Sequence, residues 1–159
     1  MGMIPPVAIG RVYVGEEPDD DDIAVLAASG FRSIVCLTRG GCDHPGEGSA
    51  MPWPRDDPER AAAAAAGLAF LRLASNGDVT PRAVATFREM VRVLPRPIFV
   101  HCGFGQGAAA LALVAEGDLL PDPAATIDVL SANGIRMPPS LIAEVAKLRA
   151  ETAGGGASR

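Results

Sequence analysis

The sequence predicts a three-layer α/β/α fold around a mainly parallel central sheet of four to five strands. Short apolar segments at 33–37, 69–74 and 98–100 alternate with longer segments that have helical patterns. Ile98-Phe99-Val100 is apolar throughout, as expected of a strand buried between two layers of helices. Aromatic residues make up only 4% of the 159 residues, so we expect a core built mainly from Ala, Val, Leu and Ile.

The other elements follow from local start and stop signals. Pro58 opens an Ala-rich helix, and Thr80-Pro81 supplies an N-cap and a first-turn proline for the next helix. The four aspartates at 19–22 suit the positive end of a helix dipole, so we interpret them as helix-capping residues and not as a metal site. The expected elements besides the three strands above are a strand at 11–14 and helical segments at 18–30, 58–67, 81–94, 107–116, 123–132 and 139–150.

The length of the chain predicts a single domain, 1–152, followed by a disordered tail at 153–159. A formal net charge of −5 provides no basic field, so neither nucleic acid nor a membrane surface is expected as a partner. The N-terminus does not have the pattern of a secretory signal, and no run approaches the roughly 18 apolar residues that a membrane span requires. We therefore expect a cytoplasmic protein. The oligomeric state does not follow from the sequence.

The cysteines do not have the spacing of a disulfide framework or a zinc motif. Cys36, Cys42 and Cys102 are an odd number at irregular intervals, which favours reduced thiols. Cys42 and His44 lie in a Gly- and Pro-rich loop without a third ligand nearby, so the loop is not expected to bind a metal. We expect neither a metal nor an organic cofactor.

Chemistry is indicated most clearly by the segment PIFVHCGFGQGAAALAL at 97–113. An apolar strand leads into a loop with glycines at 103, 105 and 107, and a helix begins where the loop ends. This order directs backbone N–H groups and the positive end of a helix dipole at one point, which favours binding of phosphate or another oxyanion. Cys102 stands at the mouth of the loop, where the same donors would stabilise a thiolate.

The chain resembles the protein tyrosine phosphatase superfamily, specifically its compact dual-specificity-like branch and bacterial relatives. The resemblance covers most of the chain and is carried by Val12-Tyr13-Val14-Gly15, the helix end Leu26 to Phe31, the strand Ser33–Leu37, the His101-Cys102 loop and the stretch Gly134–Ile142. The resemblance implies a dual-specificity-phosphatase-like fold in which Cys102 attacks phosphorus to form a phosphocysteine. It also implies an arginine six residues later that clamps the phosphoryl group, and a Ser or Thr after that arginine.

The loop departs from the family pattern at these last two positions, because Ala108 and Ala109 occupy them. Loss of one well-placed oxyanion donor costs on the order of 100- to 1,000-fold in rate, so we expect weak or absent phosphatase activity. Arg39, just beyond the 33–37 strand, is a candidate substitute, and Asp78 is the candidate general acid. We expect His101 to orient the loop and to point to the other side of the strand from Cys102. The predicted anion-binding residues are Gly103, Phe104, Gly105, Gln106, Gly107, Ala108 and Arg39.

The leading hypothesis is a phosphatase-fold protein that binds a phosphorylated protein or a small phosphate or other oxyanion. Three alternatives stay open at this point: an active tyrosine or dual-specificity phosphatase with Arg39 as its arginine, a sulfur-handling enzyme that carries a persulfide on Cys102, and a phosphopeptide-binding module without turnover.

Overall fold

The computed structural model describes residues 5–38, 58–74 and 79–157. In this part of the chain, five strands form one sheet in the order β1-β2-β5-β3-β4. The strands are β1 (Val7–Ile9), β2 (Val12–Gly15), β3 (Ser33–Thr38), β4 (Ala69–Ala74) and β5 (Ile98–His101). β1 pairs antiparallel with β2, and all other pairs are parallel. β5 is the central strand, so its carboxyl end lies between the carboxyl ends of its parallel neighbours β2 and β3.

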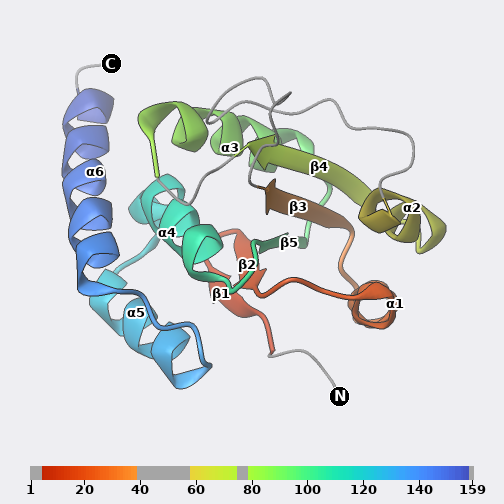
Figure 1. The fold of residues 1–159 in the computed structure, drawn as a ribbon. Coiled ribbons are helices and arrows are strands. Elements are labelled where there is room, and N and C mark those ends of the chain that lie inside the picture. The colour runs from red at the N-terminus through yellow and green to blue at the C-terminus, as the bar shows by residue number, and fades with distance from the viewer. Residues whose placement is uncertain (1–4, 39–57, 75–78, 158–159) are drawn as a thin grey trace.

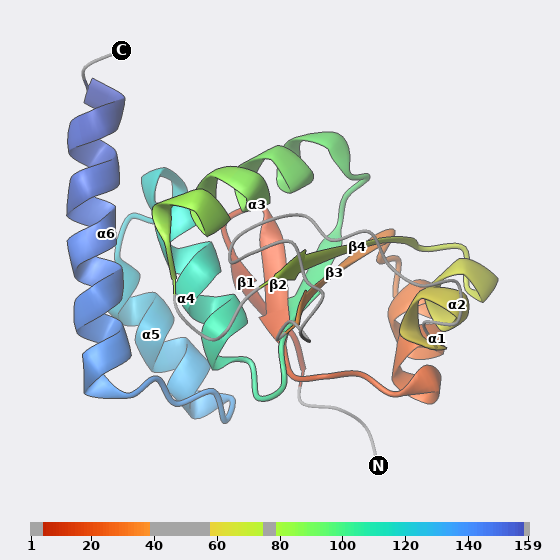
Figure 2. The same ribbon diagram turned by 45° about the horizontal axis from the view of Figure 1, so that its top comes forward.

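Helices cover both faces of this sheet (Figures 1 and 2). α1 (Asp20–Ala28) and α2 (Pro58–Ala65) lie on one face, and α3 (Pro81–Val93) and α4 (Gln106–Ala115) lie on the other. A 3₁₀ helix, η1 (Gly117–Leu119), follows α4, and α5 (Pro123–Ala132) and α6 (Pro139–Ala157) complete the chain beside α4. The predicted three-layer α/β/α architecture with a mainly parallel sheet is confirmed.

The two faces of the sheet bury separate hydrophobic clusters, which follow from the alternation of side chains along each strand. Ile34 and Phe99 face α1 and α2, whereas Val35 and Val100 face α3 and α4. α4 is buried over almost its whole length, because its sequence QGAAALALVA offers small and apolar side chains on every side. Such a helix packs close to the sheet, and this places its N-terminus against the end of β5.

The helix starts are capped by the residues that mark them in the sequence. Asp19 accepts from Asp22 N at 2.8 Å, and the Asp22 carboxylate accepts from Asp19 N at 2.9 Å, which forms a reciprocal capping box. The Thr80 hydroxyl accepts from Ala83 N at 3.1 Å, with Pro81 in the first turn of α3. The predicted strand at 69–74 and the helix at 123–132 have the observed bounds.

Three features of the fold lie outside the sequence prediction. β1 is a three-residue strand that pairs with β2 at the edge of the sheet, and its shortness gives little periodic pattern. η1 is also too short to be recognised from periodicity. α6 continues to Ala157, into the segment 153–159 for which the sequence predicts disorder. Among the described residues, no helix has the length and apolar character that crossing a membrane requires.

An ion pair between the buried Glu116 and the exposed Arg11 fixes the end of α4 to the turn between β1 and β2. Glu116 is 1% exposed, and it accepts from the Arg11 backbone N at 2.8 Å, from Nε at 2.9 Å and from Nη2 at 2.7 Å. These hydrogen bonds raise the pKa of Arg11, so the guanidinium stays charged. Because α4 carries the glycine loop at its other end, this pair contributes to the position of the loop.

We predict that Glu116→Ala lowers the free energy of unfolding by about 2–3 kcal/mol, because Arg11 loses three hydrogen bonds to a buried carboxylate. Urea unfolding measures this value. Glu89→Ala is the matched control, since Glu89 pairs with Arg92 on the exposed surface of α3. Equal unfolding midpoints for Glu116→Ala and Glu89→Ala would contradict a structural role for the Arg11–Glu116 pair.

Candidate oxyanion site at the Cys102 loop

Cys102 lies between the end of β5 and the beginning of α4. The three apolar residues of β5 are fully buried, and the half-buried Cys102 follows directly after His101. A Cβ atom placed on Gly107 would lie only 3.6 Å from Cys102 Sγ, so the thiol rests against the first turn of α4. The N–H groups of this turn and the positive end of the helix dipole are thus next to the sulfur, an arrangement that stabilises negative charge.

Gly105 shapes the loop. Its φ of +89° lies in the left-handed region, and it serves as the N-cap of α4 without a side chain. A Cβ atom there would meet Ile135 Cδ1 at 3.1 Å and the Gly15 carbonyl oxygen at 3.3 Å. The loop is therefore packed between the end of β2 and the segment before α6, and both the conformation and the space require glycine.

Further hydrogen bonds hold the two flanks of the loop. The Glu17 N–H donates to the Gly103 carbonyl at 3.2 Å, which joins the loop to the chain after β2. Gln106 Nε2 donates to the Arg136 carbonyl at 2.6 Å. The amide that the sequence suggests as an anion donor thus links α4 to the segment before α6. Phe104, by contrast, is 83% exposed at the tip of the loop.

The position of the expected arginine is part of the core. Ala108 stands six residues after Cys102 and is 0% exposed, as are Ala109 and Ala110. A methyl group packed beneath the loop offers no hydrogen bond to an anion, so any anion at Cys102 would rely on backbone N–H groups and on cations from elsewhere. Arg39 and Asp78, as well as Cys42 and His44, lie outside the described residues.

The loop opens into a cavity of about 1280 Å³. Its wall combines the Cys102 loop with the carboxyl ends of β3 and β4, the start of α2 and one side of α6. Two cations of the described residues, Arg72 and Lys147, lie on this wall. The carboxylates on the wall are Glu17, Glu59, Glu144 and Glu151. Acidic groups thus outnumber cations on the described part of the wall.

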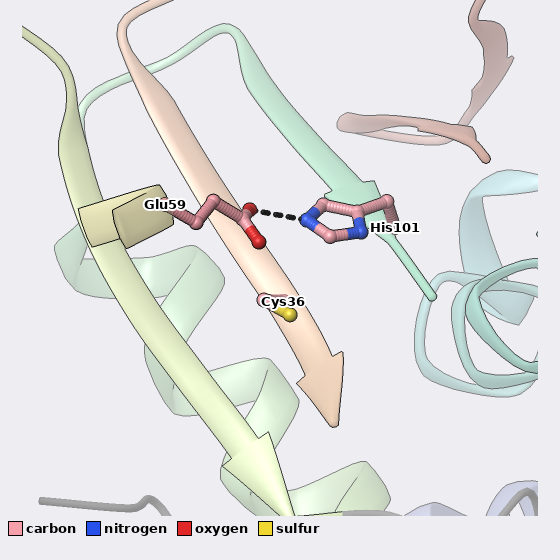
Figure 3. A group of neighbouring side chains, drawn as sticks. All are labelled: Cys36, Glu59 and His101. Carbon is pink, nitrogen blue, oxygen red and sulfur yellow. Dashed lines mark hydrogen bonds and ion pairs between the residues drawn. The ribbon is translucent and has the colours of Figure 1, made fainter. Parts of the chain in front are cut away.

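One part of this wall is a polar cluster that the sequence analysis did not identify (Figure 3). Cys36 on β3 stands in register with both Arg72 on β4 and His101 on β5, so the three side chains share the face covered by α2. Glu59, from the first turn of α2, places a carboxylate oxygen 2.5 Å from His101 Nε2. His101 thus points away from the α4 side, and its Nδ1 lies 3.4 Å from the Cys102 carbonyl oxygen.

Arg72 completes this cluster. Its guanidinium donates from Nη1 to Cys36 Sγ at 3.0 Å, and its Nη2 lies 3.8 Å from Glu59 Oε1. The side chain is 9% exposed and passes over the ring of Phe70, with 5.1 Å from Cζ to the ring centroid. The signal in the sequence was an arginine within the otherwise apolar strand AFLRLA, since a buried charge requires partners.

The comparisons with known proteins agree with this architecture. A DUF442 protein from Shewanella putrefaciens CN-32 superposes with a TM-score of 0.68 at 16% identity, covering 94% of each chain. The catalytic core of the PP-IP phosphatase SIW14 from S. cerevisiae, solved with citrate, gives 0.59 at 14% identity over 91% of this chain and 86% of that one. TpbA from P. aeruginosa, solved with pTyr, gives 0.56 at 18% identity over 89% and 85%.

The chain therefore shares the dual-specificity-phosphatase-like fold of these structures. The predicted fold resemblance is therefore confirmed. No family model matches the sequence.

Among curated proteins, a "Beta-lactamase hydrolase-like protein" from Xylella fastidiosa (strain Temecula1) is 29% identical over 107 residues, and one from Agrobacterium fabrum (strain C58) is 28% identical over 107 residues. The matched region is 67% of this chain but only 23% of each relative. The chain thus corresponds to about a quarter of the length of these relatives.

We predict that Gly105→Ala lowers the free energy of unfolding by about 1–3 kcal/mol, because alanine is strained at a positive φ and its Cβ would crowd Ile135. Gly103→Ala is the matched control in the same loop, since a Cβ atom at Gly103 would meet no atom within 4 Å. Urea unfolding of both variants tests the loop geometry. A loss for Gly103→Ala as large as that for Gly105→Ala would show that the described loop is wrong.

Proposed function

We propose that this protein binds phosphate or a related oxyanion at the Cys102 loop and hydrolyses phosphomonoesters weakly or not at all. The observation that carries the proposal is the position of Cys102 Sγ against the first turn of α4, with the buried Ala108 where the phosphatase arginine would be. The loop provides the backbone donors of an oxyanion cradle, while the clamp for the phosphoryl group is missing.

The chemistry that such a loop supports follows from its parts. A tetrahedral anion bound at the loop would accept hydrogen bonds from loop N–H groups. The Cys102 thiolate, at the base of the loop, would be the nucleophile. Attack of the thiolate on a phosphomonoester forms a phosphocysteine and breaks the bond to the leaving oxygen, which would take its proton from a general acid, the role predicted for Asp78. Water would then cleave the phosphocysteine, releasing phosphate and the thiolate. During attack, charge develops on the three equatorial oxygens. An arginine normally meets that charge, and without it the barrier rises by about 3–4 kcal/mol.

Ligands of the structural neighbours support an anionic ligand in this cavity. The SIW14 core was solved with citrate and TpbA with pTyr, and both ligands carry carboxylate or phosphate groups. The acidic wall of the present cavity favours a ligand with a single anionic group over a polyphosphate, because Glu144 and Glu151 on α6 would repel additional charge.

A second candidate is an active phosphatase whose cation comes from outside the loop. Lys147 and Arg72 line the same cavity as Cys102, and this observation favours the candidate along with the predicted role of Arg39. Arg72 is already engaged with Cys36 and Glu59, so Lys147 is the better substitute of the two.

Turnover of a small aryl phosphate by three proteins tests the proposal. We predict that wild-type protein is at least about 100-fold slower than Ala108→Arg, because the variant restores the bidentate clamp. Cys102→Ser is predicted to abolish any activity that remains. Since Ala108 is buried, thermal unfolding of the variant establishes that it is folded before its rate is interpreted.

Efficient wild-type turnover that is lost in Cys102→Ser and not increased in Ala108→Arg would contradict the proposal and favour the second candidate. Lys147→Ala then identifies the cation, with Glu144→Ala as its control on the same helix. Binding of inorganic phosphate to wild-type protein, measured by calorimetry, provides the separate test of the cradle. No binding at millimolar phosphate would contradict the proposal even if turnover is absent.

A further inference from the structure

The polar cluster on the cavity wall contains side chains that transition metals prefer as ligands. We propose that Cys36, Glu59 and His101 bind Zn²⁺ or a similar divalent transition-metal ion. The candidate ligand atoms, one on each residue, all lie within 4.8 Å of one another (Figure 3). The side chains come from β3, α2 and β5, so well-packed elements bring the three together. This inference is independent of oxyanion binding at Cys102.

The ligand types favour zinc and similar metals over magnesium or calcium. A thiolate, an imidazole and a carboxylate form the mixed S, N and O set that zinc accepts, whereas hard cations select oxygen alone. Three protein ligands leave a fourth tetrahedral position vacant for water or a ligand. All three residues line the cavity, and Cys36 and His101 are only 4% and 1% exposed, so a metal ion there would be largely enclosed by protein.

The orientation of His101 matches that of a metal-binding histidine. Its Nδ1 lies 3.4 Å from the Cys102 carbonyl oxygen, while Nε2 faces Glu59. A histidine that binds a metal through one ring nitrogen commonly donates a hydrogen bond from its other ring N–H to a carbonyl or carboxylate, and this bond fixes the orientation of the ring. The same contact connects the cluster to the Cys102 loop, because a metal on Nε2 would hold the residue that directly precedes the thiol.

Arg72 is a cation that contacts two of the three proposed metal ligands, Cys36 and Glu59. Without a metal, its guanidinium lies beside the Glu59 carboxylate and donates to the Cys36 sulfur. On metal binding, Cys36 would lose its proton to solvent and form a sulfur–metal bond. The Nη1 donor at 3.0 Å from Sγ would then hydrogen-bond the bound thiolate from outside the coordination shell. The position of Arg72 is thus compatible with the cluster both with and without a bound metal, and a metal titration distinguishes the two.

Titration of the chelator-treated full chain with Co²⁺ tests the proposal, because Co²⁺ replaces zinc and gives thiolate charge-transfer absorption and strong visible bands in tetrahedral sites. We expect one Co²⁺ per chain with both sets of bands. Cys36→Ser is expected to lose the charge-transfer band, and Glu59→Gln to weaken binding by at least about tenfold. Cys102→Ser and Cys42→Ser are the matched controls, and both are expected to retain the spectrum.

Competition by Zn²⁺ gives a second readout, since bound zinc should bleach the cobalt bands with the same stoichiometry. An absence of cobalt bands in wild-type protein would overturn the proposal. Bands that persist in Cys36→Ser but disappear in Cys102→Ser or Cys42→Ser would also overturn it, because the metal would then belong to another thiol. Glu59→Gln keeps the test decisive if Cys36→Ser does not fold.

Discussion

The structure depends on the burial of β5 between two layers of helices and on the direct passage from its carboxyl end into α4. Ile98, Phe99 and Val100 are fully buried, and β2 and β3 pair with β5 on its two sides. The chain leaves a parallel central strand at the carboxyl end of the sheet, and open α/β folds bind their ligands at this end. The short glycine loop then brings the first N–H groups of α4 to Cys102. The proposed anion-binding geometry is thus a consequence of packing as much as of the loop residues.

The same strand connects two kinds of chemistry through the alternation of its side chains. Val100 packs toward α4, His101 faces Glu59 on the α2 side, and Cys102 turns back to the start of α4. One face of the sheet therefore presents a thiol against the first turn of α4. The other face presents an imidazole in a cluster of charged and sulfur-containing groups. Because His101 contacts the Cys102 carbonyl, changes in the cluster can alter the position of the loop.

Much of this arrangement could be predicted from the sequence, because the decisive signals are local. The strand 98–100, the glycines at 103, 105 and 107 and the apolar helix that follows are contiguous, and together they predict the strand, loop and helix that position Cys102. The polar cluster could not be predicted in this way. Cys36, Glu59 and His101 are brought together by strand register and by the docking of α2, which depend on tertiary packing. Sequence periodicity predicts which face a side chain takes, but not which side chains meet across elements.

The central claim is that the loop at Cys102 binds an oxyanion, and protection of its thiol tests this claim most directly. Mass spectrometry can follow the rate at which iodoacetamide alkylates each cysteine as inorganic phosphate is added at constant ionic strength. The account predicts that phosphate slows alkylation of Cys102 in a saturable manner, and that Gly105→Ala weakens this protection. Alkylation of Cys102 at the same rate at every phosphate concentration would contradict the account.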